Sequence, residues 1–305
     1  MLMRKYWGVS LVVLSAAGFG IMPIMAVYAY RAGIGVNTLL FLRFAIAAGL
    51  FFGYLLLSKQ LRMLSWREVG ALFLLGAVGY NAEASCYFYS LKYINPSLTA
   101  LLLYTYPILV AFLGFILNKE RPGRRLGAAI LLSFAGLTLA LKATWDGTNL
   151  IGVGLGFAAA LVYSCYITAG NRTVKSVPPL TTSAYVALFA MLSFLVKGLA
   201  DRSLTFHFPV WAWLPVAAIA VCSTVVAIFG FFKGMELIGP TAASAISMIE
   251  PLVTMGLSVL LLREKVGGWQ WLGAFIVLAG AALAVLEKQE PKQENRKTVV
   301  AIGNG

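Results

Sequence analysis

Charged residues are scarce in this sequence. Asp, Glu, Lys and Arg make up 11% of its 305 residues, whereas about a quarter is usual in a soluble domain. Apolar residues make up 60%, and the mean hydropathy is +0.86. A folded chain of this composition could not cover its surface with polar side chains. The composition therefore excludes an ordinary soluble protein and favours one embedded in a lipid bilayer.

Side chains used in catalysis and metal binding are also few. The one histidine, His207, and both aspartates, Asp146 and Asp201, lie in segments that we expect to be loops. The three cysteines fall within apolar segments and have no disulfide or metal spacing. There is no histidine cluster to activate a nucleophile and no paired-aspartate site. The sequence thus favours no enzyme, and we expect no cofactor and no metal.

Apolar residues are grouped in blocks of about twenty, the length that a helix needs to cross the hydrocarbon of a bilayer. A single chain in lipid must satisfy its own backbone hydrogen bonds, and these blocks lack the alternation of a barrel strand. We therefore predict an all-α integral membrane protein with ten transmembrane helices. The predicted spans are 7–29, 38–57, 68–91, 97–117, 124–142, 150–170, 179–199, 211–234, 241–262 and 268–286.

Basic residues are distributed unevenly between the two sides of this arrangement. Counting every Lys and Arg except Arg43, in the loops and at the span ends, one side carries 16 and the other carries 7. Because the cytoplasmic side is enriched in Lys and Arg, we expect both termini in the cytoplasm, in a plasma membrane of the bacterial inner-membrane type. The polar segment 287–305 would be a cytoplasmic tail. The net charge of +13 is dispersed over the loops, so we expect no nucleic-acid partner.

The chain also contains an internal repeat. Shifting it by 144 residues without gaps superimposes several residues that determine backbone conformation or carry charge. The matched pairs are Gly8 with Gly152, Pro96 with Pro240, Pro107 with Pro251, Glu120 with Glu264, and Gly136 with Gly280. The predicted repeats cover residues 1–142 and 143–286. Since each has an odd number of spans, five, the second must be inverted in the membrane, an arrangement typical of alternating-access transporters.

The sequence resembles the EamA-type branch of the drug/metabolite transporter superfamily. The resemblance is carried by Arg43 to Ala47, by Pro107 to Glu120, by Glu250 to Glu264, and by the stretch from Trp271 to Gly280. It implies ten helices, cytoplasmic termini and a central cavity between the halves that is used for export or exchange of metabolites. Within this family the chain resembles a YddG-like amino-acid exporter. Arg43 is similar to an arginine in the second span of the family, and we expect it to be structural, binding loop carbonyls or a carboxylate.

Two glutamates lie inside predicted spans, where a charged group should face a cavity or a partner. Tyr80, Glu83 and Tyr87 are spaced so that they share one face of a helix. Two phenols beside a carboxylate could bind an ammonium group. Alternatively, Glu83 is a neutral hydrogen-bonded group or forms a structural pair with Arg43.

The ninth span presents a second group of candidates around Glu250. The substrate candidates there and in the remaining spans are Tyr104, Tyr163, Tyr166, Ser244, Ser247 and Glu250. Pro107 and Pro251 would be hinges, or permanent bends. Alternatively, the serines serve close helix packing, and Tyr163 and Tyr166 are ordinary aromatic packing residues. We expect the Gly49/Gly53 step to be a helix contact.

These observations together favour a secondary transporter that exports amino acids or related amphiphilic metabolites by alternating access. The alternatives are a phosphorylated-metabolite or nucleotide-sugar exchanger of the same superfamily, which would need more buried cations than Arg43, and a passive channel, for which no charged ring or carbonyl filter is evident. The expected partners are a small-molecule substrate and the lipid bilayer.

Overall fold

The structure is a computed structural model that describes all residues except 1, 107, 111, 114–123, 143–147, 174–176, 239–245, 248 and 288–305. The described residues form helices, turns and loops without a β-strand. The first half of the chain contains α1 (Leu2–Arg31), α2 (Val36–Leu57), α3 (Trp66–Phe73), η1 (Leu74–Tyr80), α4 (Asn81–Ser90), α5 (Pro96–Leu103) and α7 (Arg124–Lys142). The second half contains α8 (Leu150–Thr173), α9 (Pro179–Ala200), η2 (Val210–Ala212), α10 (Trp213–Ala220), η3 (Val221–Val226), α11 (Ala227–Ile238), α13 (Glu250–Leu262) and α14 (Gly268–Glu287).

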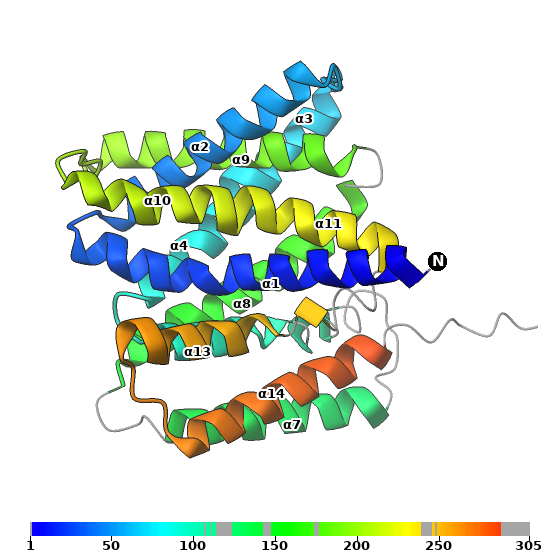
Figure 1. Ribbon diagram of the computed structural model, residues 1–305, viewed down its shortest axis with the longest axis vertical. Helices are drawn as coiled ribbons and strands as arrows, with labels where there is room; N and C mark the ends of the chain where they lie inside the picture. The colour runs from blue at the N-terminus through cyan, green and yellow to red at the C-terminus, as the bar shows by residue number, and fades with distance from the viewer. Residues whose placement is uncertain are drawn as a thin grey trace, which may run out of the picture.

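These elements occupy the ten predicted spans. Five described helices are long and apolar enough to cross a membrane, namely Tyr6–Arg31, Val36–Leu57, Trp66–Ser90, Leu180–Ala200 and Val210–Phe231. Shorter apolar helices lie in the other five predicted positions. Figure 1 shows that the helices lie roughly side by side, with the start of α1 and the end of α14 at the same end of the bundle. The predicted all-α class with ten helices in two repeats is therefore confirmed.

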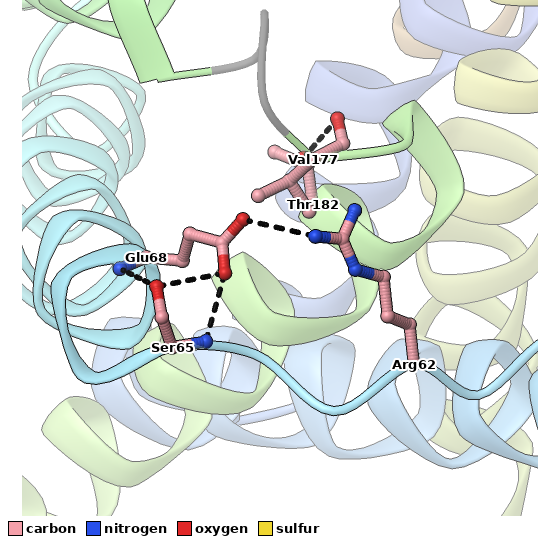
Figure 2. A network of polar contacts seen from close by, with 5 residues as sticks. All are labelled: Arg62, Ser65, Glu68, Val177 and Thr182. Carbon is pink, nitrogen blue, oxygen red and sulfur yellow. Dashed lines mark hydrogen bonds and ion pairs between the residues drawn. The ribbon is translucent and has the colours of Figure 1, made fainter.

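Local sequence signals fix where the spans begin. Ser65 caps α3 by accepting a hydrogen bond from the Glu68 amide, while the Glu68 carboxylate accepts one from the Ser65 amide. This reciprocal capping box satisfies two amides that have no partner inside the helix. Arg62 adds an ion pair to Glu68 at 3.6 Å, and Figure 2 shows this network beside the Thr182 end of α9. At the start of α5 the Asn95 side chain accepts a hydrogen bond from the Leu98 amide, directly before Pro96.

The two repeats are inverted with respect to each other, as the odd number of spans requires. The fifth helix of each repeat, α7 or α14, packs against its counterpart. In this pair the Ser133 hydroxyl donates to the Val277 carbonyl, and Gly136 lies against Gly273. Because the contacts advance along α7 as they recede along α14, the two helices are antiparallel. A repeat pair related by a two-fold axis in the membrane plane has this property.

The first helix of each repeat packs against the opposite repeat. A Cβ atom added to Gly8 would lie 2.6 Å from Cγ2 of Ile238, and one added to Gly152 would lie 2.8 Å from Cγ2 of Ile94. Gly152 lies 144 residues after Gly8, and Ile94 lies 144 residues before Ile238, so the two contacts join equivalent positions. The coincident glycines therefore mark two equivalent close contacts between the halves. The Gly49/Gly53 step differs, because nothing lies within 4 Å of a Cβ added at either position; the expected helix contact there is not formed within the described chain.

The helical hydrogen bonding changes at equivalent positions of the two repeats. The third span of each repeat contains a π-helical segment, η1 in the first and η3 in the second. Shifted by 144, the end of η1 at Tyr80 falls on Thr224 within η3. Short π-helical segments are rare and frequently occur at functional sites. The two π-helical segments thus indicate that a functional site lies where these two spans meet.

The fourth and ninth spans are also not single regular helices. α5 ends at Leu103 and is followed by a turn at Tyr104 and Thr105. The described helix α13 begins at Glu250, with Pro251 in its first turn. Proline is tolerated there because the first amides of a helix have no partner in that helix. These local breaks lie within the fourth and ninth predicted spans and beside the candidate site.

Candidate functional site

Arg43 of α2 lies buried at the contact between the two repeats. Its Nε donates a hydrogen bond to Oγ1 of Thr224 at 3.0 Å, and its Nη2 donates to the hydroxyl of Tyr80 at 3.3 Å. The guanidinium carbon lies 4.9 Å from the ring centroid of Phe44 and 5.6 Å from that of Phe88, distances at which a cation is attracted by an aromatic face. Arg43 is only 2% exposed. It thus connects α2 to both π-helical spans.

The partners of Arg43 differ from those expected. The sequence suggested loop carbonyls or a carboxylate, whereas the described partners are two hydroxyl groups. Arg43 and Glu83 are both described and form no ion pair with each other, so the alternative of a close Arg43–Glu83 pair is not realised. Tyr80 and Thr224 are related by the repeat shift of 144. One unrepeated arginine therefore bonds to equivalent positions of the two halves.

Glu83 lies in the first turn of α4, directly after the π-helical segment that ends at Tyr80. No hydrogen bond or ion pair between described residues reaches its carboxylate, although it interacts electrostatically with Arg43. It also acts on Tyr80 and Tyr87, the two phenols predicted on the same helical face. The structure brings these three side chains together as the spacing predicted.

Glu250 is held by a tyrosine from the other repeat. The Tyr104 hydroxyl lies 2.7 Å from Oε2 of Glu250 and 3.0 Å from the carbonyl oxygen of Ser247. These contacts join the turn that follows α5 to the start of α13. Glu250 and Glu83 interact electrostatically, so the two carboxylates belong to one site. Glu83 and Glu250 are both partly exposed.

A row of aromatic rings connects the two parts of the site. Successive ring centroids lie 5.9 Å apart for Tyr104 and Tyr106, 4.8 Å for Tyr106 and Tyr163, and 6.1 Å for Tyr163 and Tyr166. The row continues from Tyr166 to Tyr80 at 5.7 Å. Glu250 therefore lies at one end of the row and Arg43 at the other. Such a surface could stack against an apolar side chain and attract a cationic group.

Two residues of this arrangement, Tyr106 and Thr224, were not among the candidates from the sequence, although Thr224 could have been found by shifting Tyr80 by 144. Pro107 and Ser244 lie outside the described residues. Ser247 contributes its backbone carbonyl to Tyr104.

The sequence was compared with known proteins. The profile of the EamA-like transporter family matches residues 6–142 and again residues 150–286. The chain belongs to the EamA-like transporter family. The two matches of the EamA profile cover both halves of the chain, so the internal duplication is a duplication of the family unit. The expected resemblance is thereby confirmed at the level of the family.

Relatives of this EamA-like chain are also named as transporters. It is 24% identical over 264 residues to the uncharacterized transporter YyaM of Bacillus subtilis, covering 84% of this chain and 86% of that one. It is 27% identical over 257 residues to the uncharacterized transporter sll1319 of Synechocystis, covering 77% and 76%. A solved crystal structure with 19% identity has a TM-score of 0.63 and covers 94% of this chain and 99% of that chain, a likeness of fold. This protein is thus a multi-pass membrane protein of a transporter family.

Proposed function

We propose that this protein is a secondary transporter that exports amino acids or related amphiphilic metabolites. The observation that carries the proposal is the pair of carboxylates, Glu83 and Glu250, beside a row of tyrosines at the contact between inverted repeats. Carboxylates can bind an ammonium group, and tyrosine rings can hold an apolar side chain. Zwitterionic or cationic amphiphiles combine both features.

The inverted repeats and their interrupted helices support alternating access as the mechanism. Rocking of one repeat against the other would expose the site to each side of the membrane in turn. The interruptions at Tyr104 and at Pro251 lie within contact distance of the site and would act as hinges, with Pro107 at the equivalent position. Arg43 would have a structural role and would connect the third span of one repeat to the third span of the other. Both termini would lie in the cytoplasm. Export would therefore move substrate away from the side of the membrane on which the termini lie.

The experiment that tests the proposal is solute flux into proteoliposomes. Phenylalanine, its decarboxylated amine and its deaminated acid present the ammonium and carboxylate groups together or singly. We expect transport of the amino acid and the amine. The change Glu83→Gln should lower the apparent affinity for both by about 10- to 150-fold, because a hydrogen bond to a charged group contributes about 1.5–3 kcal/mol.

A matched control is Glu68→Gln, which removes a carboxylate from the same span but outside the site. Glutamine can replace glutamate in a capping box, so flux should be unchanged. If no amino acid or amine moves while a sugar phosphate exchanges readily, the proposed substrate class is wrong. If Glu83→Gln transports the whole panel with unaltered affinity, Glu83 does not bind substrate.

A further inference from the structure

A second buried polar cluster lies where α13 ends and α14 begins. It contains Ser97 from the first turn of α5, Ser258 from the last turns of α13, and Glu264 from the connection that follows. The Ser97 hydroxyl donates to Oε2 of Glu264 at 2.9 Å, and the Glu264 amide donates to the Ser258 carbonyl at 3.2 Å. The length of α13, about 20 Å at 1.5 Å per residue, separates Glu264 of this cluster from Glu250.

The cluster concentrates polar atoms that lack a partner. In the described part of the chain, six buried side-chain nitrogen or oxygen atoms have no hydrogen-bond partner. Four of the six belong to this short segment, namely Oγ of Ser258, Oε1 of Glu264, and both Nε2 and Oε1 of Gln270. Ser258 is 0% exposed and Gln270 is 1% exposed. Since buried polar groups are nearly always satisfied by protein, water or an ion, this concentration indicates a bound species.

The chemistry of the available ligands selects the kind of species. Carboxylate, hydroxyl and amide oxygens are hard ligands that suit hard cations, and no group of three His, Cys, Asp or Glu residues occurs in the described chain. Glu264 is the one carboxylate of the cluster, so it would balance one positive charge. The end of α13 also carries the negative end of the helix dipole. Helix ends of this kind coordinate sodium ions or protons in other transporters with inverted repeats.

We propose that Ser97, Ser258 and Glu264 form a sodium-binding site, with Gln270 in the first turn of α14 as a further oxygen ligand. The ligands come from both repeats, because Ser97 belongs to the first and the others to the second. Bound sodium would therefore hold the two halves together at this end of the bundle. The effect of this link between the halves on transport depends on the proposed function, whereas sodium binding itself does not.

The site is tested by binding of radioactive sodium to the purified full-length protein and by its thermal unfolding in detergent. Sodium chloride is compared with N-methylglucamine chloride at equal ionic strength. We expect saturable sodium binding and a rise of the unfolding temperature with sodium concentration, since a ligand that binds only the folded state stabilises it. Glu264→Gln should abolish both effects. Ser97→Ala and Ser258→Ala should weaken the apparent sodium affinity by about tenfold or more.

Asp201→Asn is the matched control, because Asp201 is an exposed carboxylate in a different loop that accepts hydrogen bonds from Asn37 and Ser203. It should keep the sodium response of the unchanged protein. The proposal is overturned if sodium binds no better than N-methylglucamine, or if the response survives in Glu264→Gln. Should that variant not fold, unaltered sodium affinity in both serine variants overturns it equally. No solute is present, so the outcome is independent of the flux panel.

Discussion

The hydrogen bond between Arg43 and Thr224 allows a quantitative test of the tie between the repeats. Thr224→Val keeps the shape of the side chain and removes the oxygen that accepts from Arg43 Nε at 3.0 Å. The same oxygen donates to the Ile219 carbonyl at 3.0 Å, so the single substitution removes two interactions. A double-mutant cycle with Arg43→Gln isolates the one between Arg43 and Thr224.

The expected size follows from burial and charge. Arg43 and Thr224 are each 2% exposed, so water cannot replace the lost partner. A hydrogen bond to a charged group contributes about 1.5–3 kcal/mol, and we expect a coupling energy of this size. The Tyr80 hydroxyl, at 3.3 Å from Nη2, retains part of the interaction in the Thr224→Val protein.

The coupling energy is measured by equilibrium unfolding in mixed micelles with increasing dodecyl sulfate, followed by the fluorescence of the 7 tryptophans. The control cycle pairs Arg43→Gln with Ser133→Ala on α7, whose hydroxyl donates to Val277 on α14. Independent sites add within about 0.3–0.5 kcal/mol. If the Arg43 and Thr224 substitutions are equally additive, the arginine does not connect the two π-helical spans.

Three further predictions follow from single contacts. Gly8→Ala should destabilise the protein by about 1–3 kcal/mol, because its Cβ would lie 2.6 Å from the Ile238 side chain. Gly49→Ala should be neutral or stabilising, because nothing lies within 4 Å of a Cβ added there. Unfolding in mixed micelles compares the two variants, and equal effects on stability would contradict the close contact at Gly8. Ser65→Ala should lower stability by about 1 kcal/mol through loss of the α3 cap, measured by the same unfolding, and no change would show that the cap is dispensable. Burial raises the pKa of Glu264. Its carboxyl group should therefore take up a proton at a higher pH than an exposed one, and sodium binding should weaken as the pH falls through that raised pKa. Sodium binding is measured against pH, and an affinity that stays constant over this range would contradict the role of Glu264.

The cation site and the central site would have complementary roles in a transporter. The central site lies beside the interruptions of the fourth and ninth spans, and Ser97 and Glu264 join the same two spans near their far ends. A ligand at either site would therefore contact the fourth and ninth spans. Coupling between two sites requires that each ligand differ in affinity for the two conformations, and flux measured with and without sodium would determine whether this holds.

The sequence by itself determined the class, the number of spans and the duplication. A span is a local property, because its length must match the bilayer and its backbone bonds are all internal. Gly8 and Gly152 were informative for a similar reason, since a position that tolerates only a hydrogen atom constrains the residue directly. The two interior glutamates were also visible, because a charge in an apolar run is costly unless it has a role.

The tertiary structure decided which faces meet. Hydropathy distinguishes lipid from water and does not distinguish one apolar neighbour from another, so it could not place Gly49 and Gly53 away from a helix contact or bring Tyr106 against Tyr163. The partners of Arg43 lie 37 and 181 residues away along the chain. Such contacts arise only when the inverted repeats are packed, because hydrogen bonds depend on the distance between atoms in space and not on their separation in sequence.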